Sequence, residues 1–470
     1  MTNKTRIENE HPGTLDWQIT QFQYDYPEHL QASPIIRGLR SSAIEGYASR
    51  TSVYPGETLE LMVSVQPEGR FEVDIYRLGY YGGDGGRHML HMGPIEGRKQ
   101  RMPMETVERL RECGWEPSVT LTVPDDWTSG VYLAKLTREE MPRLQSYAIF
   151  IVKARRKTKV LVQVSDLTWQ AYNKWPATNS IYDDGSPEMW YQGAGVRVSF
   201  DRPYAKYCQI VDAPLSCGSG EFLLWEFPLA YWLEAEGYDV TYCSNLDTHA
   251  DPDLLMNAEV FISVGHDEYW TREMYENVTR ARDAGVSLLF LSGNALYHEI
   301  VTYGATEKEP FRSFARQRYF PDERELMGAS SFGPGYGDWT VAKPDHWVFE
   351  GTGMKAGDRI PGLIGWEYHG EPFKDVDGLE VLARSELIGL QPGEPDIGFA
   401  PRAKGDGKHA AVIYPGPRGN WVFNAGTIWW AEALSAPPGH IPAMGALGRT
   451  QGPDRRVQQI TRNLLARCLK

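Results

Sequence analysis

The stretch TKVLVQVS, residues 158–165, is the strongest indication of the fold. It is a continuous run of apolar and mostly β-branched residues, and the polar stretch DLTWQAYNKW (166–175) follows it directly. Such a run predicts a strand buried on both faces, as found in parallel sheets that helices cover. Strand and helix patterns alternate after it, so we expect an α/β domain over residues 155–470.

The segments that follow support this expectation. A helix pattern at 271–285 begins with Thr271 as N-cap and ends with Gly285 as C-cap. A second helix is expected at 222–237, although Pro228 lies inside it. The other expected elements are strands at 238–244, 258–265, 286–294, 409–416 and 420–427, and a terminal helix at 457–469.

The N-terminal part has a different pattern. Residues 1–35 are polar and contain several prolines, which predicts an arm that ties down on another element or frays. Residues 36–154 contain short alternating runs between turn residues, which predict an Ig-like β-sandwich. GDGG at 83–86 resembles a phosphate-binding loop, but no helix pattern follows it, which favours a plain loop between strands.

Composition limits the function classes. The chain has 470 residues, enough for roughly two or three domains, and a net charge of -14. The basic run KARRKTK (153–159) is better explained as a solvated linker than as a nucleic-acid site, so we expect no nucleic-acid partner. Neither an apolar leader nor an 18-residue apolar run is present, so we expect a cytoplasmic protein without a membrane span. The five cysteines, Cys208 among them, show no zinc spacing and are expected to be free thiols.

Polar side chains gather where the expected parallel strands end. The strand at 258–265 runs into His266, Asp267 and Glu268, and the strand at 286–294 ends in SGN with Asn294. Ligands bind beyond the carboxyl ends of the strands in such sheets, so the convergence favours a site. The alternative is a helix N-terminus decorated with acids, which the helix dipole stabilises.

The residues also narrow the chemistry. No cysteine or serine lies on a tight turn after a strand, so covalent nucleophilic catalysis is disfavoured. His266 and Glu268 form an HxE pair, which by itself is a weak metal signal. Tyr172, Tyr182 and Tyr204 lie near the expected pocket, and phenolate with carboxylate oxygens suit a hard cation. Each tyrosine alone could equally be a packing residue.

Several motifs carry a resemblance to a known family. LTWQAYNKW, VSFDRPY (198–204), SVGHDEYW (263–270) and FLSGNALY (290–297), in this order, resemble the large (beta) subunit of N,N-dimethylformamidase. GYYGGDGGR (79–87), GWEYHG (365–370) and NAGTIWW (424–430) resemble it too, so the likeness covers roughly residues 40 to 430. The resemblance implies that a glutamine-amidotransferase-like (flavodoxin-like) α/β domain follows the β-sandwich.

The resemblance also implies a reaction and a metal. Its enzyme hydrolyses N,N-dimethylformamide to dimethylamine and formate at a mononuclear iron (Fe3+) held by two tyrosines and one glutamate. The glutamate falls on Glu268, and the tyrosines are placed at Tyr172 and Tyr204, with Tyr182 in reserve because the spacing varies. The catalytic residues fall on His266, Asn294 and Glu367.

We therefore expect an amidohydrolase acting on a small N-substituted amide. Glu367 would be the base, His266 would orient water or protonate the leaving amine, and Asn294 would donate to the oxyanion. The alternatives are a binding protein with a degenerate catalytic domain and an iron-dependent oxidative enzyme. We expect a homo-oligomer. Whether the protein also needs a small partner subunit is left open, because this chain is shorter than the enzyme's large subunit.

Overall fold

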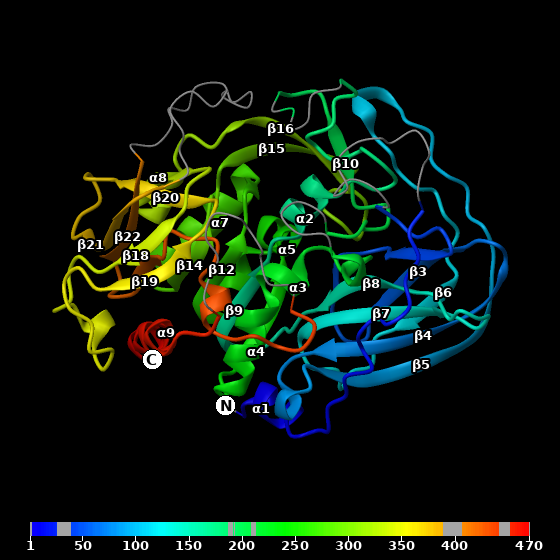
Figure 1. The fold of residues 1–470 in the computed structure, drawn as a ribbon, viewed down its shortest axis with the longest axis horizontal. Coiled ribbons are helices and arrows are strands. Elements are labelled where there is room, and N and C mark those ends of the chain that lie inside the picture. Colours follow the sequence, from blue (N-terminus) through cyan, green and yellow to red (C-terminus); the bar gives the residue numbers. More distant parts are fainter. Residues whose placement is uncertain are drawn as a thin grey trace.

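The computed structural model describes residues 2–25, 39–186, 191, 193–207, 213–388, 407–440 and 452–469. These residues form a mixed α/β structure in which strands predominate (Figure 1). Most of the expected arm after residue 25, the start of the expected sandwich at 36–38, and Cys208 lie outside the described residues. No helix in the described ranges is both long and apolar enough to cross a membrane.

Two sheets make up the described N-terminal part, on the right in Figure 1. Their strand orders are β1-β3-β6 and β2-β8-β7-β4-β5. Alternating side chains such as Leu61 and Ile75 meet in one buried cluster between the sheets, as the alternating sequence pattern predicts. The strands are β1 (Ile44–Ala48), β2 (Ser52–Val53), β3 (Thr58–Val65), β4 (Gly69–Leu78), β5 (Gly86–Gly97), β6 (Val119–Thr122), β7 (Gly130–Arg138) and β8 (Gln145–Val152).

The GDGG segment is a loop between strands. The short 3-10 turn η2 (Tyr81–Gly83) ends at its first residue, Gly83, and strand β5 begins at its last residue, Gly86. Because no helix follows, the segment lacks the helix N-terminus on which a phosphate loop depends.

The described part of the N-terminal arm is tied down on the α/β part. Helix α1 (Lys4–Glu8) is anchored by Thr5, whose hydroxyl donates to the Val240 carbonyl at 3.0 Å. Asn3 donates to the Gly237 carbonyl at 2.8 Å, and the Trp17 side chain is completely buried. Of the two expectations for this arm, attachment is therefore the one observed.

A seven-stranded sheet forms the centre of the molecule, with the order β11-β9-β12-β14-β23-β22-β21. The first five of these strands are parallel, and β22 and β21 add antiparallel neighbours at one edge. The strands are β9 (Thr158–Val164), β11 (Val240–Ser244), β12 (Ala258–His266), β14 (Ser287–Gly293), β21 (Glu380–Glu386), β22 (Lys408–Pro415) and β23 (Trp421–Asn424). TKVLVQVS thus supplies strand β9, which lies second from one edge of the sheet and is largely buried, as expected.

Helices cover both faces of this sheet. Side chains such as Val162 pack with α3, α4 and α9 on one face, and their neighbours such as Leu161 pack with α5, α6 and α7 on the other. This arrangement explains why the strands are apolar on both sides. The helices are α2 (Asp166–Tyr172), α3 (Phe222–Trp225), α4 (Phe227–Ala235), α5 (Asn245–Ala250), α6 (Pro252–Met256), α7 (Arg272–Ala284), α8 (Glu323–Met327) and α9 (Arg455–Cys468).

The helix ends test the sequence predictions directly. Thr271 caps α7 by accepting from the Met274 amide, and Gly285 closes it with φ 107°, as expected. The single helix expected at 222–237 is instead two helices that meet at Glu226. The physical reason is Pro228, which has no amide hydrogen and is tolerated only in the first turn of a helix, so a new helix begins beside it.

Further strands form three smaller sheets outside the central one, with the orders β10-β16-β15-β13, β17-β20 and β18-β19. They are β10 (Arg197–Ser199), β13 (Tyr269–Trp270), β15 (His298–Tyr303), β16 (Ser313–Tyr319), β17 (Ala329–Phe332), β18 (Gly337–Thr340), β19 (Arg359–Ile364) and β20 (Tyr368–Pro372). The remaining 3-10 turns are η3 (Val107–Arg109), η4 (Pro214–Ser216), η5 (Trp347–Phe349) and η6 (Ala431–Ala433). In Figure 1, β15 and β16 run across the top of the central part.

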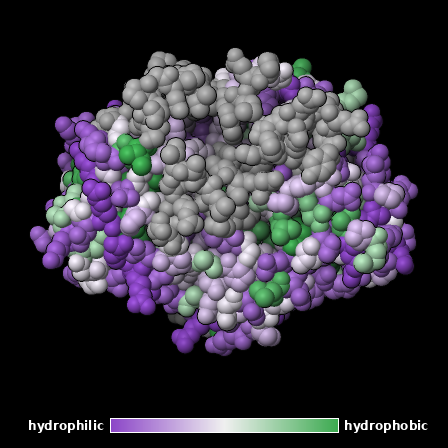
Figure 2. Space-filling view, in the orientation of Figure 1, coloured by the Kyte–Doolittle hydropathy of each residue, from purple (hydrophilic) through white to green (hydrophobic). Residues whose placement is uncertain are grey.

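The described surface is largely polar in the view of Figure 2, with apolar residues in small separate patches. Exposed large apolar side chains such as Met104, Val107 and Met141 lie outside the central sheet. Most of the described aromatic side chains are instead buried in the interior, which also contains the site described next.

Candidate active site

The site lies at the point where the strand order of the central sheet reverses. Strand β9 has β11 on one side and β12 on the other. The chain therefore first adds a strand on one side of β9 and then crosses over to add the next strands on its other side. Helix α2 begins directly after β9, Glu268 follows the end of β12, and Asn294 follows the end of β14. The carboxyl ends of parallel strands at such a reversal are the usual place for ligands, so the fold itself brings these three segments together.

Two glycines allow the chain to pass through this crowded region. Gly265 has φ +68°, and a Cβ there would lie 2.6 Å from the Cβ of Trp225. Gly293 lies so close to the loop after β19 that a Cβ would lie 2.3 Å from the Glu367 carbonyl oxygen. These close approaches place His266 and Asn294 beside Glu367.

Three oxygen-bearing side chains form a tight cluster in which Tyr182 and Glu268 are buried and Tyr172 is half-buried. The Tyr172 hydroxyl donates to Glu268 Oε2 at 2.8 Å, and the Tyr182 hydroxyl lies 3.1 Å from the same oxygen. The two hydroxyls lie 2.7 Å apart, and Tyr269 donates to the Tyr182 hydroxyl at 2.6 Å. The Arg316 guanidinium lies over the Tyr182 ring, 4.7 Å from its centroid, and places a positive charge near these phenols.

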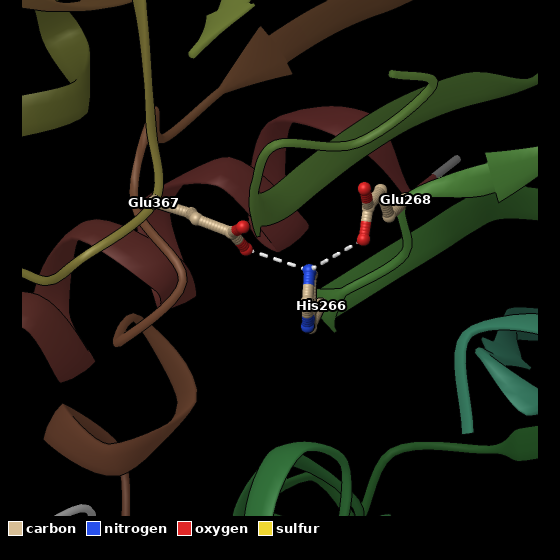
Figure 3. Close-up of side chains that lie close together, drawn as sticks. All are labelled: His266, Glu268 and Glu367. Carbon is tan, nitrogen blue, oxygen red and sulfur yellow. Dashed lines mark ion pairs between the residues drawn. The ribbon is translucent and has the colours of Figure 1, made fainter. Parts of the chain in front are cut away.

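A histidine links this cluster to a second carboxylate (Figure 3). His266 Nε2 lies 2.6 Å from Glu367 Oε2 and 3.3 Å from Glu268 Oε2. The Asn294 side-chain amide donates to Glu367 Oε1 at 2.9 Å. His266 Nδ1, on the opposite edge of the ring in Figure 3, is fully buried and has no hydrogen-bond partner among the described residues.

A second histidine, which the sequence analysis missed, faces the same glutamate. His298 Nε2 lies 3.3 Å from Glu268 Oε1. Its ring is stacked between Tyr269, at a centroid distance of 5.3 Å, and Tyr319, at 5.2 Å. His298 follows Asn294 by four residues in the sequence, but no local pattern marks it as a site residue. It lies beside Glu268 only because the chain turns after β14.

Burial and charge together set the protonation of the site. Burial lowers the pKa of His266, but Glu367 and Glu268 outweigh this and raise it well above its ordinary value. Burial raises the pKa of Glu268, but the hydrogen bond with His266 and the charge of His298 lower it overall. Burial raises the pKa of Glu367, which makes it the more readily protonated of the two carboxyls. The result is an imidazolium between two acids of different basicity.

The two phenols next to Glu268 are neutral without a cation. Burial raises the pKa of Tyr172 and of Tyr182 well above the ordinary value, and the Glu268 charge raises both further. A bound cation would reverse this effect, because it stabilises the phenolates and the carboxylate at the same time.

Tyr204 does not join this cluster. Its ring packs against Trp169 at a centroid distance of 6.3 Å, and it lines one cavity with Asp166 and Arg312 and another with Tyr172. Within the described residues no hydrogen bond joins its hydroxyl to Tyr172 or Glu268. The structure therefore brings together Tyr172, Tyr182, Glu268, His266, Asn294 and Glu367, and leaves out Tyr204.

The oxygen cluster fits a single metal ion. Metal–oxygen bonds of about 2.0–2.2 Å place neighbouring ligand oxygens roughly 2.8–3.4 Å apart. The oxygens of Tyr172, Tyr182 and Glu268 lie 2.7, 2.8 and 3.1 Å apart, close to this spacing.

A second donor set shares one residue with the first. His266, Glu268 and Glu367 each offer a ligand atom within 4.8 Å of the others. This set could also hold a metal ion, and its His266 Nε2 and Glu367 Oε2 lie 2.6 Å apart. The phenol-containing set offers oxygen donors alone, which suit a hard cation better than a set that includes a nitrogen.

Aromatic rings enclose the histidine. The Trp366 ring meets His266 edge-on at a centroid distance of 5.4 Å, and Trp225 does so at 6.0 Å. Trp225 in turn stacks on Trp429 at 5.3 Å. The surroundings of His266 are thus largely apolar, which strengthens the electrostatic interactions inside the site.

Comparison with known proteins places the chain in a family. A comparison with curated proteins finds no match for the chain. The family described as N,N-dimethylformamidase beta subunit-like, C-terminal, matches residues 72–443. This range includes every residue of the site described above. The chain belongs to the N,N-dimethylformamidase beta subunit-like family.

Proposed function

We propose that the protein is a metal-dependent amidohydrolase that cleaves the C–N bond of a small N-substituted amide such as N,N-dimethylformamide. The observation that carries the proposal is the oxygen cluster of Tyr172, Tyr182 and Glu268 next to the paired His266 and Glu367. Family membership supports a related amidohydrolase role.

Tyr172, Tyr182 and Glu268 would hold the metal, for which three hard oxygen donors favour ferric iron (Fe3+). This assignment takes Tyr182 in place of Tyr204, because the Tyr182 hydroxyl lies 2.7 Å from that of Tyr172. When bound, the ion supplies a Lewis acid for an amide carbonyl or a water molecule. His298 would keep Glu268 oriented, since its ring is held between two tyrosines.

The neighbouring residues would move the protons. Glu367, whose pKa burial raises, would accept a proton from the attacking water. His266 lies 2.6 Å from Glu367, so a proton can pass between them and onward to the nitrogen of the leaving amine. Asn294 uses one amide hydrogen to hold Glu367, and its second hydrogen would be directed at the developing oxyanion.

The surroundings favour a small substrate with apolar substituents. Trp225 and Trp366 contact His266 with their edges, and the Tyr172 ring lies 5.1 Å from it. Aromatic walls of this kind bind N-alkyl groups well and offer few partners to a charged substituent.

The experiment begins with the metal content and the visible spectrum of the protein as purified, followed by amine release from N,N-dimethylformamide. We expect about one iron per chain, a tyrosinate-to-iron absorption band, and turnover. Glu268→Ala should lose metal, band and turnover together. Glu299→Ala is the control, because Glu299 is another buried carboxylate, which pairs with Arg272.

Four outcomes would overturn the proposal. Glu268→Ala could keep metal and full activity, in which case the site lies elsewhere. Glu367→Gln could turn over normally with its iron, and then the base is another group. Turnover that requires oxygen would instead favour the oxidative enzyme, and a protein that takes up no iron would favour the binding protein.

We also propose the finer domain description. Residues 36–154 would form an Ig-like sandwich, and residues 155–470 an amidotransferase-like domain. The separate apolar cluster around Leu61 and Ile75 supports the first, and the five parallel strands support the second. A small partner subunit is proposed because the family is described as beta subunit-like. A homo-oligomer is proposed as well, and the mass of the purified assembly tests both.

A further inference from the structure

One histidine of the GWEYHG motif has no part in the proposed chemistry. His369 lies on β20, is completely buried, and comes two residues after Glu367. Both of its ring nitrogens are engaged: Nε2 accepts from the Ala295 amide at 3.0 Å, and Nδ1 lies 2.6 Å from Asn424 Oδ1. This single ring therefore connects three motifs that lie far apart in the sequence: FLSGNALY, GWEYHG and NAGTIWW.

The backbone decides the direction of these hydrogen bonds. The Gly426 amide donates to Asn424 Oδ1 at 2.9 Å, so this atom is an oxygen that accepts. His369 Nδ1 must then carry the hydrogen and donate to the same oxygen. Nε2 is left without a hydrogen and accepts from the Ala295 amide. Burial lowers the pKa of His369 to about 4, in agreement with a neutral ring.

Ala295 lies inside a strained turn. Asn294 and Leu296, on either side of it, both have φ 52°, a left-handed conformation that residues other than glycine rarely adopt. Such residues persist only where the surroundings hold them in place. Besides the bond to His369, the Leu296 amide donates to the Asp267 carbonyl at 3.2 Å, and the Ser331 hydroxyl donates to the Ala295 carbonyl.

We propose that His369 is a positioning residue of the site: its neutral ring holds the turn at residues 294–296, and the turn directs the Asn294 amide at Glu367. The inference rests on the proposed function, because it assigns His369 an effect only through Asn294 and Glu367. A rigid acceptor is needed here, since the Asn294 amide must stay 2.9 Å from Glu367 Oε1.

Two substitutions separate the two ring nitrogens. In His369→Gln the side-chain oxygen can reach the position of Nε2 and still accept from Ala295. In His369→Asn the shorter side chain reaches only the position of Nδ1, so the Ala295 amide loses its acceptor. The matched control is His409→Asn, which shortens another completely buried histidine whose Nε2 contacts the Ala425 carbonyl at 3.1 Å.

Steady-state kinetics on N,N-dimethylformamide, with iron content measured in parallel, tests the proposal. We expect His369→Asn to lower kcat about 10- to 100-fold with KM and iron content little changed, and His369→Gln to restore most of kcat. Adding Asn294→Ala to His369→Asn should cause no further loss, because both changes remove the same interaction. In the double variant of His409→Asn and Asn294→Ala, by contrast, the fold-losses in kcat of the two single variants should multiply.

The results that overturn the inference are specific. Equal kcat values for His369→Asn and His369→Gln, or full multiplication of the His369→Asn and Asn294→Ala effects, would show that the ring does not act through Asn294. If Asn294→Ala itself keeps full activity, the proposed function is wrong at this residue and the inference falls with it. Should neither His369 variant fold, amide exchange of residues 293–297 in the unmodified protein decides: rapid exchange at Ala295 refutes the held turn.

Discussion

Replacing Tyr182 by phenylalanine is the sharpest test of the metal site. The change removes one hydroxyl and keeps the ring, so the packing against Tyr172, at a centroid distance of 4.6 Å, is retained. That hydroxyl lies 2.7 Å from the Tyr172 hydroxyl, 3.1 Å from Glu268 Oε2 and 2.6 Å from the Tyr269 hydroxyl. One substitution therefore removes a donor to a buried carboxylate and the acceptor of a buried phenol.

Two magnitudes follow from these contacts. Without metal, the unpaired Tyr269 hydroxyl and the weakened Glu268 site should cost about 2–4 kcal/mol of unfolding free energy. Changes to residues that merely support a metal ligand cost about 10- to 100-fold in affinity, so loss of one of three ligands should cost more than about 100-fold. Tyr204→Phe should change neither quantity much, because its hydroxyl lies outside the cluster.

Equilibrium iron titration followed by visible absorption measures the affinity, and denaturant unfolding of the metal-free protein measures the stability. We expect Tyr182→Phe to lose iron, and the residual band to shift because one phenolate is gone. The opposite pattern, with iron retained in Tyr182→Phe and lost in Tyr204→Phe, would refute the assignment of ligands made from the hydroxyl distances.

Two further predictions concern the rest of the fold. Arg77→Met breaks a fully buried ion pair, in which Arg77 Nη2 lies 2.8 Å from Glu234 Oε1, and should lower the unfolding free energy by about 3–5 kcal/mol in urea; a loss below 1 kcal/mol would contradict it. Burial raises the pKa of Asp166 from 3.8 to about 7. The folded protein then holds a proton that the unfolded chain releases, so this group destabilises the protein as pH rises from 3.8 to about 7. Asp166→Asn should flatten that part of the stability profile, and an unchanged profile would exclude the shift.

The local sequence patterns of the chain were sufficient to predict much of the fold. Continuous apolar runs predicted the central strands, and Thr271 and Gly285 predicted both ends of α7, because capping depends on residues close in sequence. The break of the expected helix at 222–237 was harder to predict, because Pro228 is compatible with the first turn of a new helix.

The local sequence pattern was sufficient to identify the family and to locate the strand ends at which the site is proposed. His266, Glu268 and Asn294 each follow a recognisable strand, and Glu367 and Tyr172 each lie in a motif that resembles the family. The packing of the folded chain showed that Tyr182, rather than Tyr204, lies beside Tyr172 and Glu268, and it placed His298 beside Glu268 and His369 beside the Ala295 amide. The physical reason is that ligand and hydrogen-bond distances depend on how turns and loops far apart in sequence pack together, and no local pattern encodes that packing.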